Sequence, residues 1–115
     1  MNKNDLRAKI EIRVLKSEII HIDDWESDVQ MCELTGEKLM FISELSMKNG
    51  KVDEKTFYNY AIIECLYTTP EDGDEKVYSA KDFDEVKDLP GLIYSQLVQT
   101  IMRLHGLTGE SNPKN

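Results

Sequence analysis

The residue types best suited to chemistry are the two histidines of this chain, His21 and His105. His21 precedes Asp23 and Asp24, and imidazole and carboxylate groups are accepted ligands for transition metals. We expect this segment to be extended, so this spacing splays the three side chains and predicts no metal site. His105 ends an apolar-periodic run. At a helix C-terminus its ring can meet free carbonyl groups, so we expect it to cap a helix rather than to catalyse.

Two other features have the composition of a functional site without its spacing. Residues 71–75 are Glu-Asp-Gly-Asp-Glu, but the glutamate that a calcium loop requires at its twelfth position would fall on Phe83 if Asp72 were first. A tight acidic turn is the better interpretation. Cys32 and Cys65 lie far apart and lack the spacing of a metal-binding pair. We expect both to be small buried apolar side chains, with a disulfide or redox pair as the alternative.

The common catalytic motifs are absent from the sequence. It has no glycine loop that would cradle a phosphate, no Gly-x-Ser-x-Gly and no cysteine with a suitable local base. Pairs of carboxylates are frequent, but in a chain this acidic they carry no information about acid–base catalysis. We expect no catalytic residues, no cofactor and no bound metal, and we interpret the chain as a binding protein rather than an enzyme.

Charge is distributed unevenly along the chain. The formal net charge is −8, residues 1–16 carry +3, and the remainder therefore carries −11. Residues 17–37 hold seven acidic side chains and no basic one. Such a surface repels phosphate backbones, which argues against a nucleic-acid partner. It either solvates the protein or suits a partner with basic stretches. As an alternative function, an acidic inhibitor from a mobile element would use it to mimic DNA.

Length and hydropathy predict one soluble domain. A chain of 115 residues can bury a modest core, and we place the domain at residues 1–110 with a disordered tail at residues 111–115. The longest apolar runs are far shorter than the roughly 20 residues that span a bilayer. The first residues lead into no apolar signal-peptide core. We therefore expect a cytoplasmic protein with no membrane partner.

Short strands are expected first along the chain. Ile10, Ile12 and Val14 alternate with charged residues, which favours a half-buried strand. A short helix that starts at Leu6 remains the alternative, because residues 6, 10 and 14 are four apart. Ile19, Ile20 and Ile22 form a second extended segment, and residues 29–34 alternate again.

Two helices follow the strands. Thr35 suits the N-cap of the first, which we expect to end at Asn49-Gly50, and Asp53 suits the N-cap of the second, which runs from residue 54 to about residue 66. Residues 63–67 fit equally a strand that pairs with Val77-Tyr78. The expected apolar stripe of the first helix comprises Leu39, Met40, Ile42 and Leu45, and it includes Met47 if the helix extends that far.

The last third of the chain has the most specific order. An acidic loop-helix at residues 82–88 precedes a helix at residues 91–105, whose apolar positions are Ile93, Leu97, Ile101 and Leu104. Pro90 costs little just before a helix, and Gly106 suits a left-handed C-cap onto which Leu107 can fold back. We predict an α+β fold, with short N-terminal strands or a hairpin followed by a helix-rich region of about four helices.

This order resembles the small tail assembly chaperones of long-tailed bacteriophages. The resemblance covers roughly residues 25–110 and includes Val29 to Glu37, the apolar run from Ile62 to Tyr78 with its Asp72-Gly73-Asp74-Glu75 turn, and the close Leu104-His105-Gly106-Leu107-Thr108. His105 replaces the asparagine that is more usual in the family. A family of this kind implies a small acidic, non-catalytic protein made in two lengths by ribosomal frameshifting, of which this chain would be the short form.

The resemblance also implies partners. Tail assembly chaperones coat the phage tape-measure protein in the host cytoplasm until tail-tube protein subunits polymerise around it, and they are not expected in the mature virion. Holding a long partner favours arrays, which makes a homo-oligomer a further expectation. Methionine adapts to varied helical partners, and Trp25 sits in an acidic run where a core anchor is unusual. The candidate partner-binding residues are Trp25, Met40, Met47, Tyr58 and Met102.

Overall fold

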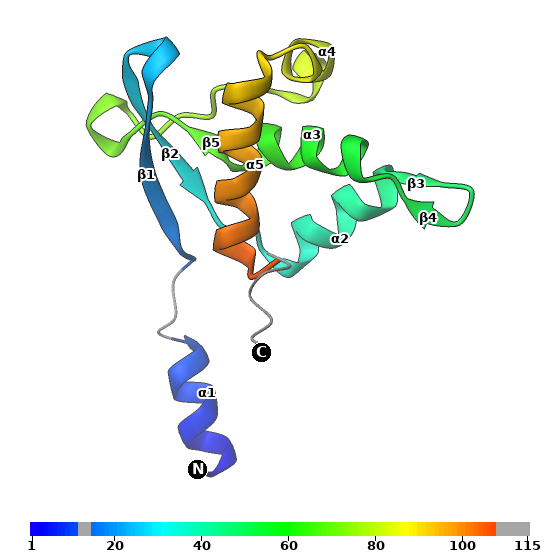
Figure 1. Ribbon diagram of the computed structural model, residues 1–115. Helices are drawn as coiled ribbons and strands as arrows, with labels where there is room; N and C mark the ends of the chain where they lie inside the picture. Colours follow the sequence, from blue (N-terminus) through cyan, green and yellow to red (C-terminus); the bar gives the residue numbers. More distant parts are fainter. Residues whose placement is uncertain (12–14, 108–115) are drawn as a thin grey trace, which may run out of the picture.

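A computed structural model of the protein describes residues 1–11 and 15–107. A small antiparallel sheet is formed by β1 (Ser17–Ile22), β2 (Ser27–Cys32) and β5 (Leu66–Tyr67), in the order β1-β2-β5. Helices pack against it and against each other (Figure 1). The predicted α+β class is confirmed.

The β1–β2 hairpin confirms two of the predicted extended segments. Ile20 lies opposite Val29, and His21 lies opposite Asp28. A short 3-10 turn, η1 (Asp23–Trp25), joins the strands, and Glu26 follows it with a left-handed φ of 48°. Alternation along β1 places Ile22 in the core, whereas in β2 three consecutive residues, Val29, Gln30 and Met31, are buried.

The strand prediction for residues 10–14 is wrong as far as the structure describes them. Residues 10 and 11 belong to helix α1 (Lys3–Glu11), and residues 12–14 lie outside the described residues. Asn2 caps this helix, because its Oδ1 accepts a hydrogen bond from the Asp5 amide at 2.9 Å. Leu, Arg, Ala and Lys favour helix strongly enough to override the β-branched Ile10. The alternative helix is therefore correct up to Glu11, where the described part of this segment ends, and it stands apart from the sheet and the other helices (Figure 1).

Helix α2 (Gly36–Leu45) begins as predicted, with Thr35 Oγ1 accepting from the Lys38 amide at 3.2 Å. Its predicted end at Asn49-Gly50 is wrong. The helix stops at Leu45, and a small hairpin follows, made of β3 (Met47–Lys48) and β4 (Lys51–Val52). Asn49 and Gly50 have φ values of 53° and 80°, as a tight hairpin turn requires. Asn-Gly thus acts here as a hairpin turn rather than as a helix stop.

Helix α3 (Glu54–Cys65) lies at the centre of the fold, packed against α2, β2 and two further helices. Asp53 caps it as predicted, because Oδ2 accepts from the Thr56 amide at 3.1 Å. The sequence allowed either a helix or a strand for residues 63–67. In the structure, residues 63–65 end helix α3 and residues 66–67 form β5. Tyr67 pairs with Gln30 of β2 and forms an isolated bridge to Lys76, one residue before the predicted partner Val77.

The acidic turn and the C-terminal helix are confirmed. A 3-10 turn, η2 (Pro70–Asp72), precedes Gly73 at φ 106°, and η3 (Ala80–Asp82) leads into α4 (Phe83–Lys87). Helix α5 (Gly91–His105) has its predicted bounds and packs against β1, β2 and α3. Gly106 adopts φ 66°, and the Leu107 amide donates to the Met102 carbonyl at 2.8 Å, which closes the helix end.

One apolar core joins these elements. It includes Met31 from β2, Ile42 from α2, Ile62 from α3, Val86 from α4 and Leu97 from α5. In the described part of the chain, no helix is both long and apolar enough to cross a membrane. The tail predicted at residues 111–115 lies outside the described residues.

Candidate partner-binding surface

Exposed apolar side chains gather on α2 and on the β3–β4 hairpin that follows it. We call this set the hairpin patch. Its members and their exposed fractions are Met40 (67%), Phe41 (54%), Leu45 (47%), Met47 (48%) and Val52 (45%). Large apolar side chains exposed on neighbouring elements are typical of interaction sites.

The patch is exposed because α2 has more apolar residues than one face can bury. Leu39 to Ile42 are four consecutive apolar residues, and successive side chains on a helix point about 100° apart. Ile42 is buried in the core and Leu39 packs against the core. Met40 and Phe41 therefore point toward solvent. Phe41 and Leu45 are one turn apart and share a side of the helix.

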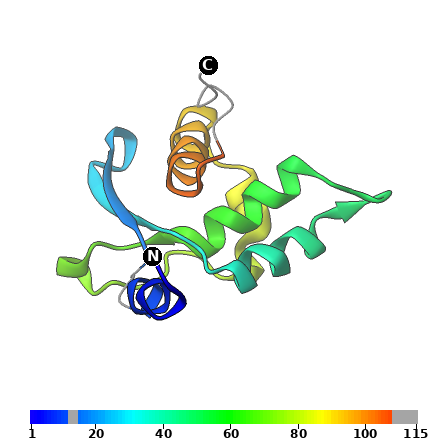
Figure 2. The same ribbon diagram turned by 90° about the horizontal axis from the view of Figure 1, so that it is seen from below.

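The hairpin extends this surface outward. Met47 lies directly opposite Val52 across the two strands, so their side chains share one face of the ribbon. Figure 2 shows the hairpin projecting beyond the ends of α2 and α3, away from the rest of the molecule. A two-stranded ribbon with an uncovered apolar face is only marginally stable alone in water. Its exposure is therefore a cost that a partner would remove.

Two of the five predicted partner-binding residues, Met40 and Met47, come together in this patch. The other three lie on different elements. Trp25, on η1, is half-buried and lines an open hollow of about 440 Å³ with Tyr78 and Leu89. Tyr58, on α3, is half-buried with its ring edge-on to a neighbouring phenylalanine at 5.1 Å, and Met102 is half-buried on α5.

Sequence reasoning missed Phe41 and Val52 as exposed apolar residues, and it assigned Leu45 to the apolar stripe of α2 alone. A signal for Phe41 was present, because four consecutive apolar residues cannot all face one core. A signal for Val52 lay in Asn49-Gly50, whose hairpin geometry places Val52 opposite Met47.

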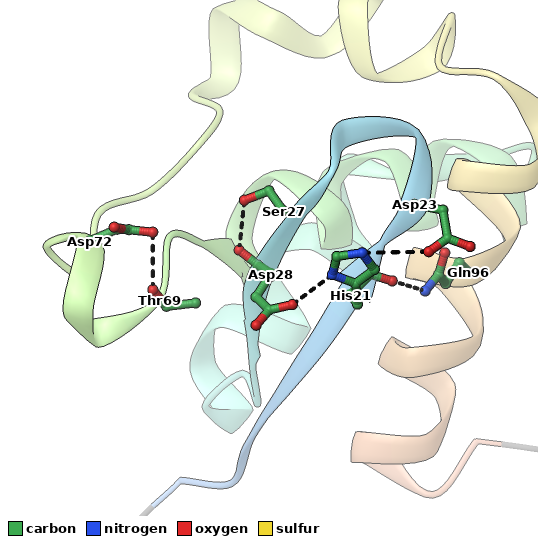
Figure 3. A network of polar contacts seen from close by, with 7 residues as sticks. All are labelled: His21, Asp23, Ser27, Asp28, Thr69, Asp72 and Gln96. Atoms are coloured by element: carbon green, nitrogen blue, oxygen red, sulfur yellow. Dashed lines mark hydrogen bonds and ion pairs between the residues drawn. The ribbon is translucent and has the colours of Figure 1, made fainter.

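His21 makes polar contacts but no metal-type cluster (Figure 3). Its Nδ1 lies 2.8 Å from Asp28 Oδ1 across the hairpin, and its Nε2 lies 3.5 Å from Asp23 Oδ1. The Gln96 amide of α5 donates to the His21 carbonyl at 2.8 Å, which ties α5 to β1. Among residues 1–11 and 15–107, no group of three or more histidine, cysteine or acidic side chains is arranged to hold a metal ion.

The predicted capping role of His105 is confirmed. Its Nδ1 lies 2.8 Å from the Ile101 carbonyl, and its Nε2 lies 2.9 Å from the Leu34 amide nitrogen. A carbonyl only accepts and an amide only donates, so Nδ1 carries the proton and Nε2 accepts. The neutral ring therefore closes the end of α5 and also joins it to the segment before α2.

A second hollow of about 440 Å³ is lined by both apolar and polar side chains, among them Leu15, Glu64 and Cys32. Glu64 forms ion pairs there with Lys38 at 2.8 Å and with Lys76 at 3.2 Å. Both thiols are free, and burial raises the pKa of Cys32 and raises that of Cys65 to about 12. A protonated, buried thiol is a poor nucleophile. Cys65 is buried in the core as expected, whereas Cys32 is only half-buried.

The fold was compared with those of known proteins. No family model matches the chain, and no curated protein matches it. Among solved structures, the chain is similar to the bacteriophage HK97 tail assembly chaperone, with a TM-score of 0.60 and 15% sequence identity. The match covers 88% of this chain and 98% of that chain. The two proteins share a fold, so the resemblance detected in the sequence is confirmed at the level of the fold.

Proposed function

We propose that this chain is a phage tail assembly chaperone that acts without catalysis in the bacterial host cytoplasm. In this role it binds apolar helical stretches of the tape-measure protein and helps to recruit tail-tube subunits. The observation that carries the proposal is the fold shared with the HK97 tail assembly chaperone over 88% of this chain. The exposed hairpin patch supplies a surface that fits such a role.

The chemistry of the hairpin patch suits a helical partner. An amphipathic helix binds by laying its apolar stripe into an apolar surface. Met40 and Met47 are unbranched and adaptable, so they can repack against different stretches of a long partner. The formal net charge of −8 keeps a complex with an apolar protein in solution.

Co-expression tests this function. A phage tape-measure protein is expressed alone and together with this chain, and its soluble fraction is measured. We expect the chain to increase the soluble fraction. The variant Met40→Ser with Phe41→Ser should lose most of this effect, because it removes the most exposed part of the hairpin patch.

The matched control is Leu92→Ser, because Leu92 is 77% exposed at the start of α5, outside the hairpin patch. We expect this variant to retain the full effect. No gain in soluble tape-measure protein with the native chain would overturn the proposal. A salt-sensitive complex with a basic nucleic-acid-binding protein would then favour the DNA-mimic alternative.

A further inference from the structure

A small hollow of about 300 Å³ lies where helices α3, α4 and α5 meet, and it shares no residue with the hairpin patch. Its lining holds two lysines and no acidic side chain. The lining residues are Lys55 and Asn59 from α3, Lys87 from α4, Leu89 from the segment before α5, and Gly91 and Tyr94 from α5. In a protein whose formal net charge is −8, a hollow of this composition is a local exception that attracts negative charge.

The spacing along each helix brings these groups to one place. Lys55 and Asn59 are four residues apart on α3, and Gly91 and Tyr94 are three apart on α5, so each pair shares a face of its helix. Helix α3 packs against both α4 and α5. The Tyr94 hydroxyl donates to Asn59 Oδ1 at 2.7 Å, which joins the two faces beside the hollow.

The start of α5 supplies hydrogen-bond donors. The first N–H groups of a helix have no intrahelical acceptor, and their partial positive charge favours an anion. Pro90 occupies the N-cap and has no side chain that could accept from them, and the first turn of α5 holds no acidic residue. Among the described residues, the amides of Gly91 and Leu92 have no acceptor. This helix end can therefore bind an oxyanion.

Asn59 carries a buried donor without an acceptor. This residue lines the hollow, and only 5% of its surface is exposed. Tyr94 satisfies its Oδ1, but its amide nitrogen Nδ2 has no acceptor within residues 1–11 and 15–107. A buried N–H group without an acceptor costs free energy, so nearly all such groups in native proteins are paired. An oxyanion in the hollow would supply the missing acceptor.

The acidic side chains near the two lysines do not neutralise the hollow. Asp84 Oδ1 lies 3.5 Å from Lys87 Nζ, but 87% of the Asp84 side chain is exposed, and an ion pair this open is weak. Glu54 and Asp88 adjoin Lys55 and Lys87 in sequence, yet neither lines the hollow. Lys55 has no ion pair in the part of the chain that the structure describes. Both ammonium groups are therefore available to an anion.

We propose that this hollow is an oxyanion-binding site that takes a phosphate or carboxylate group. The oxyanion accepts hydrogen bonds from the Gly91 amide at the start of α5 and from Asn59 Nδ2, and Lys55 and Lys87 balance its charge. Leu89 contributes an apolar wall. The site is separate from the hairpin patch, and its chemistry does not depend on the proposed function.

Titration with inorganic phosphate tests the site. Phosphate is added to the full chain at constant ionic strength, with sodium chloride as the balance, and amide signals are followed by two-dimensional NMR. We expect saturable shifts of the Gly91 and Leu92 backbone amides and of the Asn59 side-chain amide. Acetate is titrated in parallel as the carboxylate probe. Tighter binding of phosphate would identify a phosphate group as the preferred ligand and tighter binding of acetate a carboxylate, and either result supports the site.

Lysine variants separate a built site from general attraction. Lys55→Gln with Lys87→Gln should weaken phosphate binding about tenfold, because it removes both cations of the hollow. Lys48→Gln with Lys51→Gln makes the same charge change on the β3–β4 hairpin and should retain the native affinity. All four lysines are exposed, so both double variants should unfold at the same urea concentration as the native chain.

A second pair of variants isolates the helix end. Gly91→Pro removes the N–H group from the first position of α5, where proline suits a helix, and should weaken phosphate binding about fivefold. Gly91→Ala keeps this N–H group and should bind phosphate as the native chain does. A Cβ at this position meets nothing within 4 Å, so the alanine variant should fold normally.

Three outcomes would overturn the inference. Shifts that rise with phosphate without saturating would mean that no site is present. Native affinity in Lys55→Gln with Lys87→Gln would show that the two lysines do not hold the anion. Saturable shifts that map to the hairpin lysines, and not to Gly91 and Asn59, would place the anion elsewhere.

Discussion

At the scale of single residues, His105 links two parts of the fold through its ring. Its imidazole joins two segments that lie 71 positions apart, because it donates to Ile101 at the end of α5 and accepts from the Leu34 amide before α2. Both bonds require the neutral tautomer with the proton on Nδ1. A side chain that can only donate hydrogen bonds, or that can form none, therefore loses at least one of these two bonds.

Replacing His105 by phenylalanine should therefore destabilise the fold. The change leaves the Leu34 amide unpaired beside the core, which costs about 1–3 kcal/mol of unfolding free energy. The same change at His21 should cost less than about 1 kcal/mol, because its contacts with Asp28 and Asp23 are exposed. Urea denaturation of both variants measures the difference. An equal loss of unfolding free energy in the two variants would contradict a stabilising role for the hydrogen bond between His105 and the Leu34 amide.

Glu64 predicts a dependence of stability on pH. Burial raises the pKa of this carboxyl group, but hydrogen bonds and charge from Lys38 and Lys76 outweigh burial, so the net pKa is lowered. A carboxyl group with a lowered pKa in the folded state stabilises the fold above its unfolded pKa, and this stability is lost as pH falls through the folded pKa. The ion pairs of Glu64 thus weaken in acid.

Glu64→Gln should accordingly be less stable than the native chain at pH 7, by about 1 kcal/mol or less, and the difference should shrink toward pH 3. Urea denaturation across this pH range measures it. Glu71→Gln is the control for loss of a carboxylate, because Glu71 is exposed on η2, away from the ion pairs of Glu64 with Lys38 and Lys76. A difference for Glu64→Gln that stays constant with pH would contradict the assignment.

At the scale of elements, sequence reasoning succeeded where a helix end has a local chemical signature. Thr35 and Asp53 cap helices through short side-chain bonds, and Gly106 supplies a left-handed cap, so three helix boundaries could be predicted from single residues. The prediction was wrong where the same residues are typical of two different structures. Asn49-Gly50 fits a helix stop and a hairpin turn equally, and which one forms depends on strand pairing across residues 47–52.

The candidate surface was harder to predict for a related reason. Periodicity shows which residues of a helix share a face, but not which apolar face the rest of the fold covers. Met40 and Leu45 fitted a core-facing stripe, and only the packing of α2 on α3 turned them outward. Burial is a tertiary property, and here it depends on residues that are distant in sequence.

The hairpin turn gives a prediction at this scale. Gly50→Ala should destabilise the hairpin by about 1–2 kcal/mol, because φ at this position is 80° and left-handed backbone strains a residue with a Cβ. Gly36→Ala should be neutral or stabilising, since this glycine begins α2 without a left-handed φ. A Cβ meets nothing within 4 Å at either site, so only backbone conformation differs. Amide exchange at residues 47–52 measures the effect, and equal behaviour of the two variants would contradict it.

At the scale of the whole molecule, helix α1 and the rest of the fold are distinct in packing and in charge. Residues 1–9 are exposed, and α1 lies away from the sheet and the other helices (Figure 1). A helix of nine residues is marginal in water unless it packs against something. The apolar core draws its residues from positions 22–104, so the fold does not depend on α1.

Removal of residues 1–14 should therefore leave the free energy of unfolding, measured by urea denaturation, within about 0.5 kcal/mol of the native chain, as for surface changes away from structural features. It should make the formal net charge more negative, because this segment carries four basic and two acidic side chains. Leu15 is kept, since it lines the hollow beside Glu64. A loss of several kcal/mol on truncation would mean that α1 packs against the body in solution. An unchanged midpoint, with the solubilising effect on the tape-measure protein intact, would assign both stability and binding to residues 15–115.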